Sequence, residues 1–369
     1  MINRGTCAIQ IRPFFTLLLH FATMVYFILV RMMAMKRKPC FLIFIPLLFL
    51  TVQGLNAITV QELFRSAVSV RISYSLFKVD LELASLRRIR AEIEAKEELD
   101  RLNAEFSYVG ALADYRRANL AFFNETLDTV FNVALAELDA SIADVKAENA
   151  NEDARLAQTR YLNGLLSEEG LKESGLALST VTTDQELAAW TFADAAEVFR
   201  SALDRDWNGT LVPQVPDFIP SGTIELWLEK DTTLRRAKLS EKIAILKTAK
   251  LAANAAAFDR RIQQAELAKA KVAVTTTEND TRRAFDATVR KLKNQKALLQ
   301  LRTEESVLKA TLARDATRRY ESGFAPLSEK NAQRTSELGA RKNLLSAQRT
   351  YLKTIVEYLV YTDADPMEF

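Results

Sequence analysis

Apolar residues recur at helical spacing through most of the chain. One set comprises Leu83, Leu86, Ile93, Leu99 and Leu102, and another comprises Leu338, Leu345, Leu352, Ile355, Val356 and Leu359. No proline occurs in residues 58–212 or 221–325, and proline costs about 3 kcal/mol inside a helix. The pattern predicts a mainly α protein with long helices. Residues 61–163, as one continuous helix, would span on the order of 150 Å.

A short motif occurs twice. Residues 154–164 read ARLAQTRYLNG and residues 313–323 read ARDATRRYESG, with six of eleven positions identical and an offset of 159 residues. Three prolines fall between the copies, within LVPQVPDFIPSG (Leu211–Gly222), which we expect to be extended loop. We infer a tandem duplication with a first repeat over residues 58–212, a linker over 213–222 and a second repeat over 223–369.

Each copy of the motif is expected to end a helix. Gly164 and Gly323 close the copies, and glycine is the usual residue just past a helix because it adopts the left-handed conformation at little cost. Ser167 and Ser328 then become candidate N-caps for the next helix, with Glu329 well placed for the helix dipole. Each repeat is therefore predicted to be a long antiparallel helical hairpin with a sharp tip.

Two segments interrupt the helical pattern at corresponding places in the two repeats. Glu105–Tyr115 contains aromatic residues and Gly110, and Lys271–Asp280 contains a β-branched run. Two interpretations stay open: a kink in a helix, or a short β-like or loop remnant at the end opposite the tip.

The first 57 residues have the character of a targeting segment. They contain no Asp or Glu, and Met35-Lys36-Arg37-Lys38 precedes the apolar run Phe41–Val52. This is the pattern of a secretory signal peptide over residues 35–57. Residues 1–34 are then either an over-translated leader, with the true start at Met32, Met33 or Met35, or, through Phe14–Val30, a signal anchor. The protein is expected to be exported.

Removal of this segment changes the chemistry that is available. Six of the 50 basic residues lie in it, so the rest of the chain carries 44 basic against 47 acidic residues, a balance of −3. The rest of the chain therefore lacks the net positive charge that would favour a nucleic-acid partner. Cys7, Cys40 and His20 also lie in the leader, which excludes thiol, histidine and Cys/His zinc chemistry. With no phosphate-binding loop either, we expect no enzyme and no cofactor.

The duplicated layout resembles the TolC family of outer-membrane efflux proteins. The best-matching stretch is Arg318–Val360, and the first repeat matches through Arg160–Leu178. Ala57–Val68 looks like the family's first short helix, and Leu211–Pro220 looks like its linker between repeats. The resemblance covers essentially the whole chain after residue 57.

The resemblance implies a fold and partners. A TolC-like coiled α-barrel protomer would form a homotrimer, in which twelve helical strands build a tube through the periplasm. The helix-turn tips would dock a periplasmic adaptor that couples to an inner-membrane pump, in a tripartite efflux or type I secretion system. By position, the docking tips would comprise Tyr161, Asn163, Gly164, Ser167, Tyr320, Ser322, Gly323, Ser328 and Glu329.

The sequence departs from the family at the end opposite the tips. Members carry a β-hairpin in each repeat, and a membrane strand needs about 9–11 residues of alternating pattern. Neither interruption is long enough for two such strands, so we expect little or no β-barrel. The location is then outer membrane or periplasm. The alternative functions are a barrel-less periplasmic helical scaffold or adaptor-like structural protein, and an unrelated exported helical bundle.

Overall fold

The computed structural model describes residues 58–209, 212–251 and 256–368. The predicted leader and signal peptide, with both cysteines and the histidine, lie outside the described residues.

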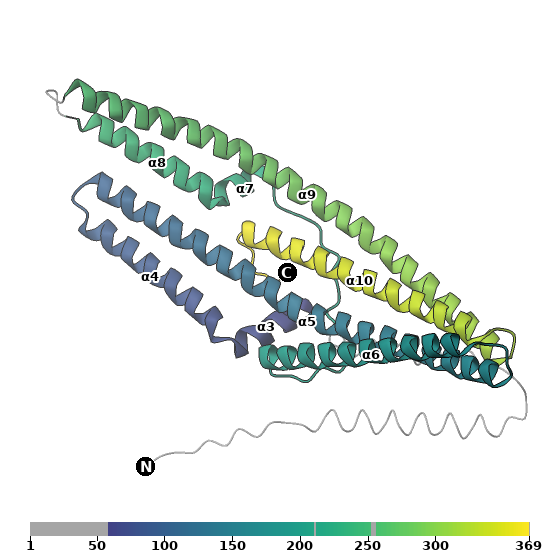
Figure 1. Ribbon diagram of the computed structural model, residues 1–369. Helices are drawn as coiled ribbons and strands as arrows, with labels where there is room; N and C mark the ends of the chain where they lie inside the picture. The colour runs from purple at the N-terminus through teal and green to yellow at the C-terminus, as the bar shows by residue number, and fades with distance from the viewer. Residues whose placement is uncertain (1–57, 210–211, 252–255, 369) are drawn as a thin grey trace, which may run out of the picture. The chain divides into compact units, whose positions relative to one another are not determined.

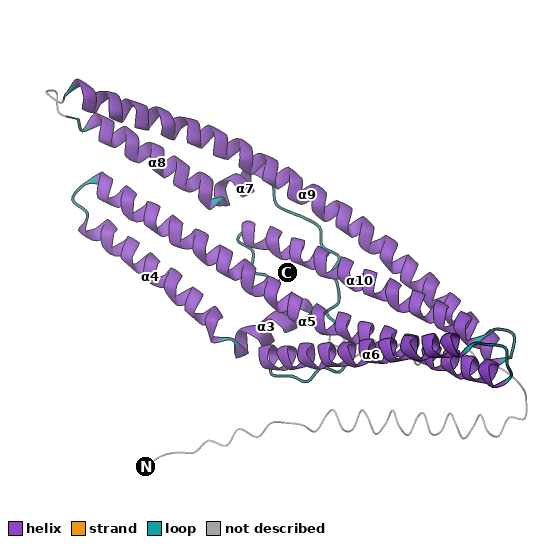
Figure 2. Ribbon diagram, in the orientation of Figure 1, coloured by secondary structure: helices purple, strands orange, loops and turns teal. Residues whose placement is uncertain are grey.

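The described part of the chain is helical and contains no strand (Figures 1 and 2). The first repeat holds α3 (Val60–Val70), α4 (Ile72–Glu94), α5 (Glu98–Leu162) and α6 (Glu168–Leu203), and the second holds α7 (Ile224–Lys230), α8 (Thr232–Ala249), α9 (Ala257–Glu321) and α10 (Leu327–Tyr361). The prediction of a mainly α chain built from two long antiparallel hairpins is confirmed. None of these helices combines the length and apolar character that crossing a membrane requires.

The long helices α5 and α9 each have 65 residues, or roughly 98 Å at 1.5 Å per residue. Around the tips the packing order is α6, α5, α10, α9, and at the other end it is α4, α5, α8, α9. Thus α6 packs on α5 near the tips, and α4 packs on α5 beyond the end of α6 (Figure 1). In the same way, α10 lies between α5 and α9 near the tips, and α8 lies between them at the other end. The helices thus form two four-helix rows, and both rows contain α5 and α9.

The expectation of one continuous helix over residues 61–163 is wrong. The helix breaks at Arg71 and at Ala95–Glu97, where the chain reverses and α4 packs back on α5. No glycine or proline marks either break. The reversal is instead held by tertiary contacts: the rings of Tyr74 and Phe122 are 4.9 Å apart, and an Arg88 nitrogen lies 3.5 Å from a Glu105 oxygen. Packing between helices thus overrides local propensity.

The two unusual segments are helical, so a β-like or loop remnant is wrong at both. Glu105–Tyr115 lies within α5 and Lys271–Asp280 within α9. A threonine of the second segment fits the helix because its hydroxyl donates to a carbonyl one turn back, as Thr275 does to Lys271 at 3.4 Å. The Arg236 guanidinium lies beside Gly110 and 4.5 Å from the centre of the Phe106 ring.

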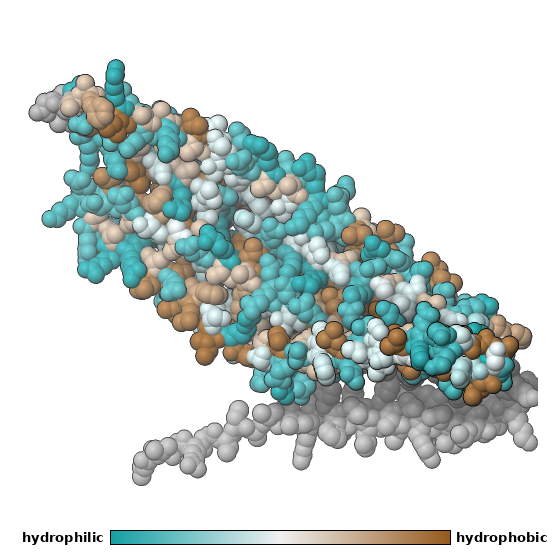
Figure 3. All heavy atoms as spheres, in the orientation of Figure 1, coloured by the Kyte–Doolittle hydropathy of each residue, from teal (hydrophilic) through white to brown (hydrophobic). Residues whose placement is uncertain are grey.

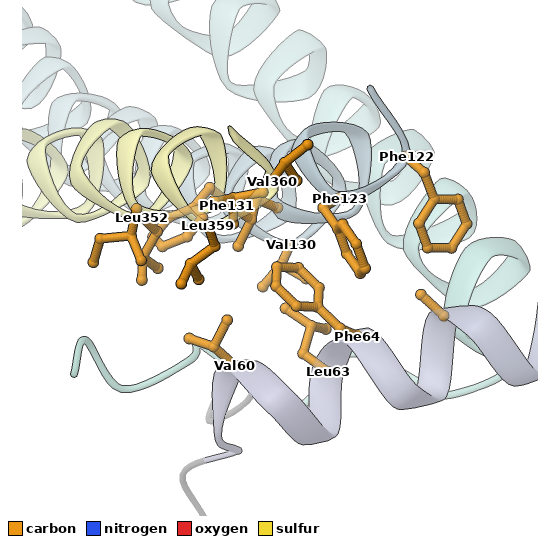
Figure 4. Packing of buried hydrophobic residues seen from close by; sticks show 14 of the residues in the cluster. Val60, Leu63, Phe64, Phe122, Phe123, Val130, Phe131, Leu352, Leu359 and Val360 are labelled. Carbon is orange, nitrogen blue, oxygen red and sulfur yellow. The ribbon is translucent and has the colours of Figure 1, made fainter. Parts of the chain in front are cut away.

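The main core lies at the middle of α5, where α3, the end of α6 and the end of α10 converge. Phe64 of α3 packs against Phe123 of α5 at 4.5 Å between ring centres (Figure 4). From α10, Leu352 and Ile355 are fully buried. A capping box fixes the start of α3, because the Thr59 hydroxyl accepts from the Glu62 N–H and the Glu62 carboxylate accepts from the Thr59 N–H.

The described part of the proline-rich segment, residues 212–222, is a loop, as predicted, and it packs on this core. Its Phe218 ring lies 5.6 Å from Tyr358, and the Gly222 N–H donates to the Tyr358 hydroxyl at 2.8 Å. The Gln214 N–H donates to the Ile58 carbonyl at 3.2 Å. The linker is therefore a strap that ties both repeats to one core.

Candidate docking tips

The first tip is a tight helical stop between α5 and α6. The Leu165 N–H donates to the Arg160 carbonyl at 2.8 Å, and the Gly164 N–H donates to the Tyr161 carbonyl at 2.9 Å. Gly164 has φ +73°, the left-handed conformation that this pair of bonds requires. This is a Schellman motif, with Asn163 at the C-cap.

The second tip repeats this geometry 159 residues later. The Phe324 N–H donates to the Arg319 carbonyl at 2.8 Å, the Gly323 N–H donates to the Tyr320 carbonyl at 2.9 Å, and Gly323 has φ +76°. Ser322 occupies the C-cap. The expectation that both glycines end helices in the left-handed conformation is confirmed.

The helix starts after the tips differ in chemistry. Ser167 caps α6, as expected, by accepting from the Gly170 N–H at 3.2 Å. Hydrogen bonds from its own backbone N–H and from Ser167 lower the pKa of Glu169. Ser328 as an N-cap is wrong, because α10 begins at Leu327 and Pro326 occupies the cap. The 159-residue offset places Pro326, not Ser328, opposite Ser167, so the duplicated register decides where the helix starts.

Charged groups reinforce only the second tip. Glu329 accepts from Arg319 across the reversal at 2.7 Å. The Lys330 ammonium lies 5.1 Å from the centre of the Tyr320 ring. At the first tip, Gly170 stands at the position of Glu329, so this cross-tip ion pair has no counterpart there.

Three exposed apolar residues at the tips were missed by the sequence reasoning. Leu162, Leu165 and Phe324 are 72%, 76% and 80% exposed, and brown (apolar) spheres lie among teal (hydrophilic) ones at this end of the molecule in Figure 3. In a Schellman motif the residue after the glycine commonly packs back onto the helix, whereas Leu165 and Phe324 point to solvent. Residues 161–167 and 322–328 contain no charged side chain. One feature of the sequence could have identified this surface: an apolar residue, Leu165 or Phe324, follows the glycine of each tip.

A polar cluster joins the two repeats near the tips. Asn331 of α10 is fully buried, and its amide donates at 2.9 Å to both Glu148 and Asn149 of α5. Farther along the same pair of helices, Lys342 pairs with Asp139 at 2.5 Å and Lys353 with Asp128 at 2.6 Å. These contacts hold the two hairpins in register.

No protein-family model matches the sequence, and no curated protein matches it. Solved structures do match. The Campylobacter jejuni CmeC outer membrane channel has a TM-score of 0.53 and 13% identity, covering 82% of this chain and 85% of that chain. The outer-membrane channel OprN has a TM-score of 0.55 and 14% identity, covering 84% of this chain and 90% of that chain. The Vibrio cholerae outer membrane protein VceC has a TM-score of 0.52 and 11% identity, covering 83% and 96%. The chain has the fold of the helical part of the TolC-family outer-membrane channels.

Proposed function

We propose that the protein is a TolC-like conduit component of a tripartite efflux or type I secretion system in the cell envelope. The observation that carries this proposal is the pair of matching tips on a TolC-like helical fold. Both tips are closed by the same backbone hydrogen bonds, free of charge at their ends and apolar at Leu162, Leu165 and Phe324. Exposed apolar residues on a hydrogen-bonded turn are a surface that a docking partner can bury.

The helix order supports the proposal of a ring of three copies. Each row has α9 at one edge, and in the row at the tips the opposite edge is α6. Large apolar side chains are exposed on both edge helices: Leu187, Trp190 and Val198 on α6, and Leu301 and Leu308 on α9. Packing α6 of one copy on α9 of the next is a heterologous contact, which closes into a ring when the rotation fits. Three copies supply the twelve helical strands of a tube.

The docking role is tested by site-specific photo-crosslinking in cells that make the protein. A photoreactive residue at Leu165 or Phe324 is expected to capture a periplasmic adaptor, identified by mass spectrometry. Thr180, an exposed position farther along α6, serves as the matched control and should not capture it. Adaptor capture from Thr180 but from neither tip would refute docking through the tips.

A second candidate is a periplasmic helical scaffold or adaptor-like structural protein. The observation that favours it lies at the end opposite the tips, where α4 turns directly into α5 through three residues, Ala95–Glu97. The chain thus folds back as helical hairpins at both ends. Membrane fractionation separates the two candidates, because a conduit is recovered with the outer membrane and a scaffold with the soluble periplasm.

A further inference from the structure

Helix α4 carries two rows of residues with the heptad spacing of a coiled coil. One row is buried or half-buried in the packing against α5 and comprises Tyr74, Phe77, Leu81, Ala84, Arg88 and Ala91. The other row is exposed and comprises Ile72, Leu76, Val79, Leu83, Leu86 and Ile93. Members of the two rows lie two positions apart, or about 200° around the helix. The exposed row therefore points away from α5.

No helix of the described chain covers the exposed row of α4. Its six aliphatic side chains are 43–80% exposed, and the helices that pack on α4 are α5 and α3. The heptad position between Leu86 and Ile93 is taken by Arg90, whose side chain donates to Glu94 at 2.9 Å. In a coiled coil, each member of such a row inserts between side chains of a facing helix. The row thus has the form of a seam for a helix of another molecule.

The opposite edge of the same four-helix row carries a second seam, on α9. Four exposed residues occupy its heptad positions: Phe258, Ile262, Ala265 and Val272. The half-buried residues that face α8 in this stretch are Gln263, Leu267, Ala270 and Val274. Each of these lies two positions from a heptad position of the seam, so the seam points away from α8. Lys269, between Ala265 and Val272, can lay its stem along the seam and keep its ammonium in water.

The two edges of this row carry opposite charge at the end away from the tips. Residues 92–101, at the turn from α4 to α5, hold five acidic and two basic side chains. Residues 247–251 and 256–262, at the facing ends of α8 and α9, hold four basic side chains and one acidic side chain. Within one copy, Lys250 and Glu97 pair across this boundary at 2.6 Å. The negative edge of one copy and the positive edge of another attract one another when they meet side by side.

We propose that the ring of copies is also closed at this end, where α4 of one copy packs antiparallel on α9 of the next. The inference rests on the proposed ring and deepens it, because the contact of α6 with α9 covers only the tip half of the wall. Helix α4 runs toward this end and α9 runs away from it (Figure 1), so copies related by rotation bring the two together antiparallel. The heptad spacings match when Leu83 lies opposite Val272 and Ile93 lies opposite Ile262.

Thiol cross-linking tests the contact, with Cys7→Ser and Cys40→Ser as the background so that only introduced thiols react. Leu83→Cys with Val272→Cys, and Ile93→Cys with Ile262→Cys, are each expected to give species of two and three copies with a short bismaleimide on a denaturing gel. Such a link joins two copies, because α5 and α8 separate the edges of one copy.

Leu83→Cys with Ile262→Cys is the matched control for the register. Ile262 lies ten residues, or roughly 15 Å, from Val272 along α9, so this pair should link at least tenfold less. A particle of three copies by light scattering in which neither expected pair links would overturn the inference and leave the proposed ring standing. A stable monomer would remove the ring and this contact together.

Two further results would give α4 a different partner and overturn the assignment of α9. Linking of Leu83→Cys alone into a two-copy species would show that α4 packs on α4 of another copy. Flotation of the protein with vesicles of phosphatidylethanolamine and phosphatidylglycerol, lost in Leu83→Glu, would show that a lipid surface covers the exposed row. The inference expects neither.

Discussion

Gly164 and Gly323 are the residues on which the tips depend most directly. Both have left-handed backbone conformations, and a Cβ added at either would meet no atom within 4 Å. Any effect of substitution there is therefore backbone strain and not a clash. Single substitutions at these two glycines therefore test the turn conformation of the tips directly.

Gly164→Ala and Gly323→Ala are each expected to destabilise the protein by about 1 kcal/mol, because an L side chain disfavours the left-handed region. Gly175 is the matched control, since it also has free space around its Cβ position but lies inside α6. Gly175→Ala should stabilise by about 0.5–1 kcal/mol. Urea unfolding measures all three, and equal effects at the tip and helix glycines would contradict the assigned turn geometry.

Individual residues also mark the limits of what the sequence predicts. The glycines were found because glycine has a distinctive backbone preference. Ser328 was misassigned because serine is a good cap in general, while the duplicated register places Pro326 at that position. Leu162, Leu165 and Phe324 were missed because an apolar residue beside a helix end commonly packs inward, and their exposure depends on the tertiary arrangement.

At the scale of elements, helix type and pairing within each hairpin were predictable, whereas the breaks were not. The absence of proline and the spacing of apolar residues predict long helices, and α5 and α9 confirm this prediction with 65 residues each. Arg71 and Ala95–Glu97 carry no local stop signal, so the division into α3, α4 and α5 arises from contacts with distant segments. The same holds for the linker, whose extended form was predicted but whose packing on the core was not.

The strap formed by the linker can be tested at Gly222, where an added Cβ would lie 2.7 Å from the Tyr358 hydroxyl. Gly222→Ala is expected to destabilise by about 1–3 kcal/mol through overpacking. In a Tyr358→Phe background the clash is removed, so the same substitution should cost less. A double-mutant cycle by urea unfolding measures this coupling, and strict additivity would show that the strap does not contact α10 in solution.

At the scale of the whole molecule, the proposed contact between copies would bury large apolar residues that a single chain leaves exposed on α6 and α9. Trp190→Glu places a charge at the proposed contact between copies and is expected to lower the oligomer mass at micromolar concentration. Trp190→Phe keeps the apolar surface and should leave the mass unchanged. Sedimentation velocity compares the two, and identical behaviour of both variants would remove α6 from the interface.

The mass of the purified protein, measured by light scattering, decides whether three copies close a helical tube. The full-length chain has a mass of 41.6 kDa. A closed tube predicts a particle of three copies of the chain, because four helical strands from one copy cannot enclose a lumen. A stable monomer across the accessible concentration range would contradict it.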